Sequence, residues 1–241
     1  SFFKYLLALL GLLIFLSPIH LNGQILDEEF GKNRIQYRLF DWKFYSSPHF
    51  DIYYYYGGQE LAKHVASYIE EEHTRITDIM GYAPYAKTKV FLYNSNLDLN
   101  QSNVGLNEAK FDIAGQTNFL TSQIEIAFGG SYNQFKKDLI FKVSKSYIND
   151  MLFGGLVSEI LSSSYLFTVP EWFTEGISAY IAYGWSAEMD DFTRDFLSSE
   201  NVFKITKQEG RAAKLAGQSI WNYISENSAR INISSILNLT R

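Results

Sequence analysis

Four histidines are the side chains of this 241-residue chain best suited to metal binding or proton transfer: His20, His49, His64 and His73. A zinc site on a helix needs two of them four residues apart, so that both imidazoles share one face. His64 and His73 are nine residues apart, which places them on opposed faces of a helix at ~100° per residue. His49 opens an expected strand, and we expect His64 and His73 to be surface residues.

Nucleophilic and acid–base chemistry finds equally little support. The chain has no cysteine, and no serine lies in a Gly-x-Ser-x-Gly elbow. The neighbours Asp190 and Asp191 could act as general acid and base, but solvation on a helix surface is the expected role. With a net charge of −5 and a pI near 5.4, the chain offers no basic stripe for a nucleic acid. A short lysine run is expected to be a solvated helix face: Lys136, Lys137, Lys142 and Lys145.

The N-terminal segment predicts export. Residues 2–16 form an apolar run behind one positive charge at Lys4, shorter than the ~20 residues that span a bilayer. We expect residues 1–23 to be a signal peptide, cleaved between Gly23 and Gln24, with an uncleaved anchor as the alternative. No stable membrane span is expected after cleavage. With no cysteine, no disulfide supports the mature protein.

The elements that must position any site fall into two parts of one domain. Residues 24–130 are predicted to be rich in strands, and residues 131–241 to be mainly helical. Strands are expected at 49–56, 88–95, 111–119 and 122–128, and helices at about 59–80, 131–153, 170–183, 186–199, 215–227 and 231–240. Ser131 is a suitable N-cap, and Gly81 and Gly154–Gly155 are suitable stops. Strands first and helices later indicate an α+β fold with a small mixed sheet.

This order of elements, together with "PEWFTEGISAY", "YGWSAEMDDFTRD" and "GQSIWNYI", resembles a known family. It is similar to the gluzincin-type (thermolysin-like) metallopeptidase domain found at the N-terminus of exported bacterial envelope proteins that continue into a Tol-type β-propeller. The resemblance covers nearly the whole mature chain. It implies a thermolysin-like zincin arrangement, in which a helix carries His-Glu-x-x-His for zinc and for activation of the bound water.

In this chain the zinc motif is degenerate. Anchored on the following "NDMLFGG", it falls on "FKVSK", so that Phe141 and Lys145 replace the histidines and Lys142 replaces the catalytic glutamate. Glu175 matches the third ligand, while a further acidic position of the family is Ala179. Phenylalanine has no donor atom, a protonated lysine repels a dication, and catalytic zinc needs about three protein ligands. We therefore expect no bound metal and no cofactor.

The degenerate positions lead to a structural prediction. We expect Lys145 to turn into the former metal site and pair with Glu175, while Phe141 fills the remaining volume. The ammonium of Lys145 would then replace the bound metal cation as the positive charge in the site. The alternative is that Lys145 extends to solvent and Glu175 is hydrated. A further alternative is that residues 141–148 form an ordinary amphipathic helix and the match is accidental.

The functional expectation is a pseudoenzyme, a catalytically inactive metallopeptidase-like domain that serves as a binding or scaffold module. Its location would be the periplasm or outer membrane of a gram-negative bacterium. Its partner would be an envelope protein or peptide, and the candidate binding edge is the strand Ser122–Phe128. The alternatives are an active zinc peptidase with unrecognised ligands, and a purely structural cap for a neighbouring β-propeller.

Overall fold

Two small sheets and a larger set of helices make up the part of the chain that is described. The computed structural model describes residues 39–102, 109–113, 116–120, 123–153, 169–198, 204, 207–227 and 231–240. All of these belong to one compact unit, Asn33–Arg241. The expected signal peptide and the expected helix stop at Gly154–Gly155 lie outside the described residues.

The main sheet has four strands in the order β1-β2-β3-β6. Its members are β1 (Lys43–Ser46), β2 (Phe50–Tyr54), β3 (Thr88–Tyr93) and β6 (Gln123–Ala127). β1 is antiparallel to β2, whereas β3 runs parallel to both β2 and β6. The sheet is therefore mixed, as expected. The stretch 111–119, expected as one strand, instead contributes to two antiparallel strands of a separate sheet, β4 (Ala109–Ile113) and β5 (Gln116–Leu120).

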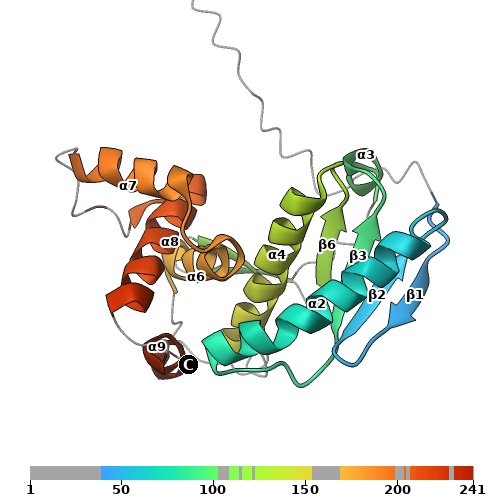
Figure 1. Ribbon diagram of the computed structural model, residues 1–241, viewed down its shortest axis with the longest axis horizontal. Helices are drawn as coiled ribbons and strands as arrows, with labels where there is room; N and C mark the ends of the chain where they lie inside the picture. The colour runs from blue at the N-terminus through green and yellow to red at the C-terminus, as the bar shows by residue number, and fades with distance from the viewer. Residues whose placement is uncertain are drawn as a thin grey trace, which may run out of the picture. The chain divides into compact units, whose positions relative to one another are not determined.

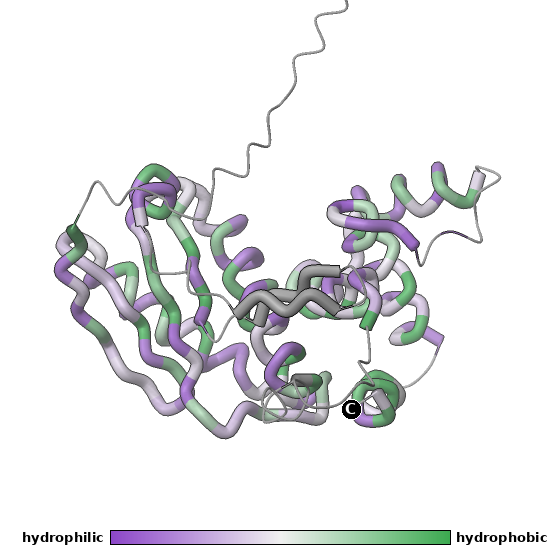
Figure 2. The backbone as a smooth tube through the Cα atoms, turned by 180° about the vertical axis from the view of Figure 1, so that it is seen from behind, coloured by the Kyte–Doolittle hydropathy of each residue, from purple (hydrophilic) through white to green (hydrophobic). Residues whose placement is uncertain are grey.

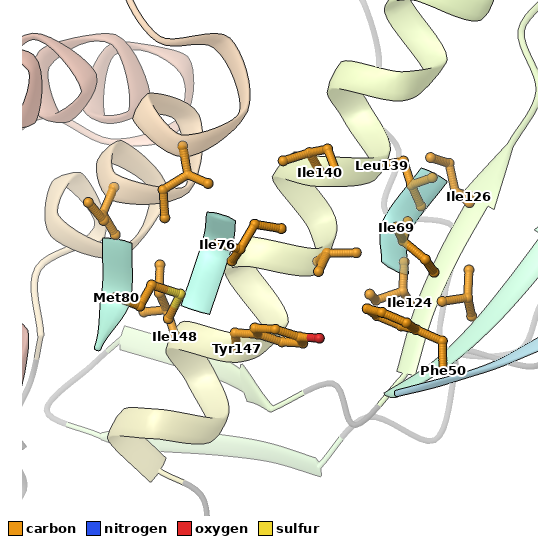
Figure 3. Packing of buried hydrophobic residues seen from close by; sticks show 14 of the residues in the cluster. Phe50, Ile69, Ile76, Met80, Ile124, Ile126, Leu139, Ile140, Tyr147 and Ile148 are labelled. Carbon is orange, nitrogen blue, oxygen red and sulfur yellow. The ribbon is translucent and has the colours of Figure 1, made fainter. Parts of the chain in front are cut away.

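One face of the main sheet is buried beneath two long helices, α2 (Gln59–Met80) and α4 (Tyr132–Phe153), as Figure 1 shows. In β6, Ile124 and Ile126 are buried while the alternate residues are partly exposed, which confirms the predicted alternation. Figure 3 shows the isoleucines of β6 facing Ile69 of α2 and Leu139 of α4. Each such side chain contributes about 1.5–3 kcal/mol through its burial.

The helical half follows the predicted order. It comprises α6 (Glu171–Tyr183), α7 (Ala187–Ser198), α8 (Gly210–Asn227) and α9 (Ile231–Thr240), while the short α3 (Asn96–Asn100) was not expected. Pro170 has an extended backbone and lies just before α6 rather than in its first turn. Figure 2 shows hydrophilic and hydrophobic residues interspersed along these helices. Among the described residues, none of the helices combines the length and the hydrophobicity that a membrane crossing needs.

Helix boundaries follow local sequence rules. Gly81 takes a left-handed conformation with φ 64° and donates its N–H to the carbonyl of Thr77, which ends α2 at the predicted glycine. Ser131 accepts a hydrogen bond from the N–H of Gln134 at 3.4 Å and so caps α4 as expected. The α+β class and the small mixed sheet are confirmed.

Candidate functional site

The predicted pairing of Lys145 with Glu175 is present. Lys145 Nζ of α4 lies 2.5 Å from Glu175 Oε1 of α6, and the two side chains are 42% and 16% exposed. The carboxylate is largely covered, whereas the lysine reaches it from a position that solvent still touches. The pairing is confirmed, and the pair is only partly buried.

Phe141 lies one turn before Lys145 on α4 and packs against an aromatic ring of α6. The ring of Phe141 is 5.9 Å from the ring of Tyr183, at an interplanar angle of 35°. Lys214 Nζ of α8 lies 5.2 Å from the Phe141 centroid and 5.1 Å from that of Tyr183. At these distances the ammonium is attracted by the electron-rich faces of both rings. Phe141 therefore packs in an aromatic and cationic setting, partly buried rather than fully enclosed.

Tyr183 connects this aromatic pair to a second carboxylate. Its hydroxyl donates to Asp138 Oδ1 at 2.9 Å. Burial raises the pKa of Tyr183, and the neighbouring Asp138 raises it further. The phenol is therefore a fixed neutral donor that ties α6 to the start of α4.

Close packing of α6 against α8 holds Glu175 in place. A Cβ added to Gly176 would lie 2.4 Å from backbone atoms of Gly217, and one added to Gly217 would lie 1.8 Å from the carbonyl oxygen of Trp172. Only glycines allow the two helix backbones to approach this closely. Trp221 adds a hydrogen bond from its indole N–H to the Phe173 carbonyl at 3.2 Å. The helix that carries Glu175 is thus positioned by the segments "WFTEGIS" and "GQSIW".

The donor set at this site does not fit zinc. Of the three positions matched to metal ligands, only Glu175 carries a donor for a cation, and its carboxylate already binds Lys145. The ammonium adds a positive charge where a dication would have to lie. Lys142, matched to the catalytic glutamate, has an exposed surface, but desolvation and the neighbouring Lys145 lower its pKa, and Ala179 is buried. Within the described ranges, no group of three or more His, Cys, Asp or Glu residues could hold a metal ion.

The other candidates from the sequence are dispersed. Asp190 and Asp191 bind Arg194 on the exposed face of α7, at 2.5 and 3.2 Å, as expected for helix-surface acids. His64 is exposed, as predicted, but the prediction that His73 is a surface residue is wrong. His73 is 9% exposed, because its side of α2 packs against Phe50 and Tyr147.

The sequence analysis did not predict a cluster of histidine and carboxylate side chains around His73. Glu70 binds His49, the rings of His49 and His73 are stacked, and His73 binds Tyr147. The spacing of three between Glu70 and His73 on a predicted helix was a usable signal. Nothing in the sequence around His49 or Tyr147 indicated that these residues join the cluster.

A cavity of about 660 Å³ lies between α7 and α8. Phe192, Ala212 and Leu215 supply its apolar lining, and Glu188, Asp191 and Arg211 supply its polar lining. Arg211 forms an ion pair with Glu188 across it. None of these residues belongs to the Lys145–Glu175 site, so the two are separate features.

Comparison with known protein families, with curated proteins and with solved structures finds no match to this chain.

Proposed function

We propose that this chain is a catalytically inactive, metallopeptidase-like domain that binds a protein or peptide partner instead of cleaving it. The observation that carries the proposal is the ion pair between Lys145 and Glu175, at 2.5 Å, two residues that the sequence resemblance matches to metal-ligand positions. A lysine that neutralises the glutamate performs the structural part of the metal's role, since it offsets the negative charge. It supplies no Lewis acid and no activated water.

The order and packing of the elements support a thermolysin-like arrangement. A small mixed sheet packs on α4, the helix with the degenerate motif, and α6 then presents Glu175 toward α4. Positions 141 and 145 are four residues apart on one helix and therefore share a face. Positions 145 and 175 lie next to each other. A zinc site with two ligands on one helix and a third ligand on another would need this proximity.

The proposed partner is an extended peptide or a protein segment that adds to β6. Among the described strands, β6 is the last of the main sheet, and it packs beside α4, the helix that carries Lys142. Strand addition supplies affinity through main-chain hydrogen bonds and needs no catalytic group. The apolar run at residues 2–16 supports a location in the periplasm or at the outer membrane.

Two assays on the mature protein, residues 24–241, test this proposal. After incubation with excess zinc and desalting, elemental analysis should find far less than one zinc per chain, and a mixed set of fluorogenic peptides should stay uncleaved. About one zinc per chain, together with chelator-sensitive cleavage, would show an active zinc peptidase instead.

Peptide selection from a random display library tests the binding claim. We expect enriched peptides whose affinity falls strongly in Ala127→Pro and hardly changes in Ala127→Val. The N–H of Phe128 donates to the Tyr93 carbonyl, so the N–H of Ala127 points to the other side of β6, where proline blocks an added strand. No enrichment would favour a purely structural cap. Equal peptide binding by both variants would indicate that the peptide binds somewhere other than β6.

A further inference from the structure

Glu70 of α2 holds the turn between β1 and β2 at three points. Its Oε1 accepts from Ser47 Oγ at 2.6 Å and from the backbone N–H of His49 at 2.8 Å. Its Oε2 lies 2.7 Å from His49 Nδ1, in an ion pair when that imidazole is protonated. Turn and helix are therefore joined through one carboxylate: within the described residues, every hydrogen bond between this turn and α2 goes to Glu70.

His49 covers a second histidine. Its ring stacks on that of His73 with centroids 3.7 Å apart and an interplanar angle of 15°. His73 is buried, and its Nδ1 lies 2.9 Å from the hydroxyl of Tyr147, a residue of α4 that is only 1% exposed. The side chain of His49 is 48% exposed. One ring is thus fixed between two helices, and the other is free to leave toward solvent.

Like charges on this stack repel. Positive charges on both rings would lie about 4 Å apart in a partly desolvated place. Burial lowers the pKa of His73, and the charge of His49 lowers it further, while Glu70 partly offsets both.

The other polar groups around the stack do not relieve that repulsion. From α4 the stack meets the hydroxyl of Tyr147, which is neutral because burial raises its pKa. Across the turn, Lys87 Nζ lies 3.9 Å from Asp51 Oδ1, in a pair of opposite charges. Of the charged groups that face the rings from the described elements, Glu70 alone compensates a positive charge, and it already binds His49.

We propose that the His49–His73 stack is a pH-sensitive clamp, in which protonation of His73 expels the His49 ring, breaks its contact with Glu70 Oε2 and so weakens the hold of α2 on the β1–β2 turn. His49 is the ring that moves, because it is half exposed and lies in a turn. His73 lies on a 22-residue helix and is bonded to the core. Release occurs below the ordinary histidine pKa of 6.5. It precedes protonation of Glu70, whose pKa lies below 4.5.

Nuclear magnetic resonance on the folded protein between pH 7.5 and 4.5 tests the clamp. The His73 ring should titrate below pH 6.5, and exchange of the His49 amide, corrected for intrinsic pH dependence, should accelerate with the same midpoint. In His49→Gln the midpoint of His73 should rise by roughly one pH unit, the effect of removing a nearby like charge. The control His64→Gln changes an exposed histidine of the same helix and should leave that midpoint unchanged.

Three results would overturn the proposal. The first is an unchanged His73 midpoint in His49→Gln. The second is a His49 amide that stays protected throughout the His73 titration. The third is acceleration of that amide only below pH 4.5, which would assign release to Glu70 instead.

Discussion

At the scale of single residues, the exposure of Lys145 determines how much its ion pair contributes. A fully desolvated pair that loses one partner costs about 3–5 kcal/mol, whereas exposed pairs contribute about 0–1 kcal/mol. Here Lys145 is 42% exposed and Glu175 is 16% exposed. We therefore expect a contribution between these two ranges, because removal of Lys145 would leave mainly the carboxylate of Glu175 buried without a partner.

We therefore predict that Lys145→Met lowers the free energy of unfolding by about 1–2 kcal/mol, the cost of leaving one largely covered polar group unpaired. Adding Glu175→Gln should recover most of this loss, because the stranded charge is removed. Urea denaturation of both single variants and the double variant gives the coupling directly. Lys142→Met, on the same helix, should change stability by less than about 0.5 kcal/mol. An equal loss in both lysine variants would indicate that Lys145 stabilises the helix and not the pair.

The histidine and carboxylate cluster predicts a two-stage acid destabilisation. The folded-state pKa of His73 lies below 6.5, so its contribution to stability is complete above that pH and is lost as the pH falls below it. Burial alone would raise the pKa of Glu70, but hydrogen bonds from His49 and Ser47 lower it overall. Its contribution is complete above pH 4.5 and is lost as the pH falls through the lowered pKa.

Urea midpoints measured from pH 7.5 to 3.5 should therefore fall in two steps. His73→Asn keeps a polar atom near the place of Nδ1, so the bond to Tyr147 can persist while the titratable group is gone. In that variant the first step should disappear and the second should remain. A single step below pH 4.5 in the unmodified protein would contradict the role given to His73.

At the scale of elements, the approach of α6 to α8 should be among the most sensitive features of the fold. We predict that Gly217→Ala destabilises the protein by about 2–4 kcal/mol, since the new Cβ would lie 1.8 Å from the Trp172 carbonyl oxygen and the helices must separate. Gly129→Ala is the matched control, because its Cβ would meet nothing closer than Asn96 Nδ2 at 3.8 Å. Thermal unfolding of the two variants makes the comparison. Similar melting temperatures would mean that the helix pair separates at little cost.

At the scale of the whole molecule, the proposed relation to zinc peptidases predicts that a zinc site can be restored by substitution. Positions 141 and 145 share a face of α4, and position 145 meets Glu175 at 2.5 Å. The double substitution Phe141→His and Lys145→His should therefore create a site that binds about one zinc per chain, measured by calorimetry and elemental analysis. Adding Glu175→Gln should weaken that binding strongly. A double variant that folds and binds no zinc would count against the thermolysin-like arrangement, while the Lys145–Glu175 pair itself would stand.

Local patterns in the sequence were enough to locate most helices and strands. The spacing of apolar residues and a glycine that accepts positive φ placed α2 and its end at Gly81, and alternation placed the buried face of β6. Both signals depend only on neighbours along the chain. The pairing of Lys145 with Glu175 was also predictable, but only through the resemblance that set the two helices side by side, and the exposure of Lys145 was not.

Only the tertiary structure decided which distant residues meet. Tyr147 follows His73 by 74 positions, yet their polar atoms lie 2.9 Å apart, and this contact turned a predicted surface histidine into a buried one. The role of Gly176 and Gly217 is visible only in the structure, where the two helix backbones meet at these glycines. Periodicity reports which face of a helix is apolar, whereas the partner of that face depends on how sheet and helices pack together. The chain alone therefore determined most of its elements, and packing determined its histidine cluster and the burial of its candidate site.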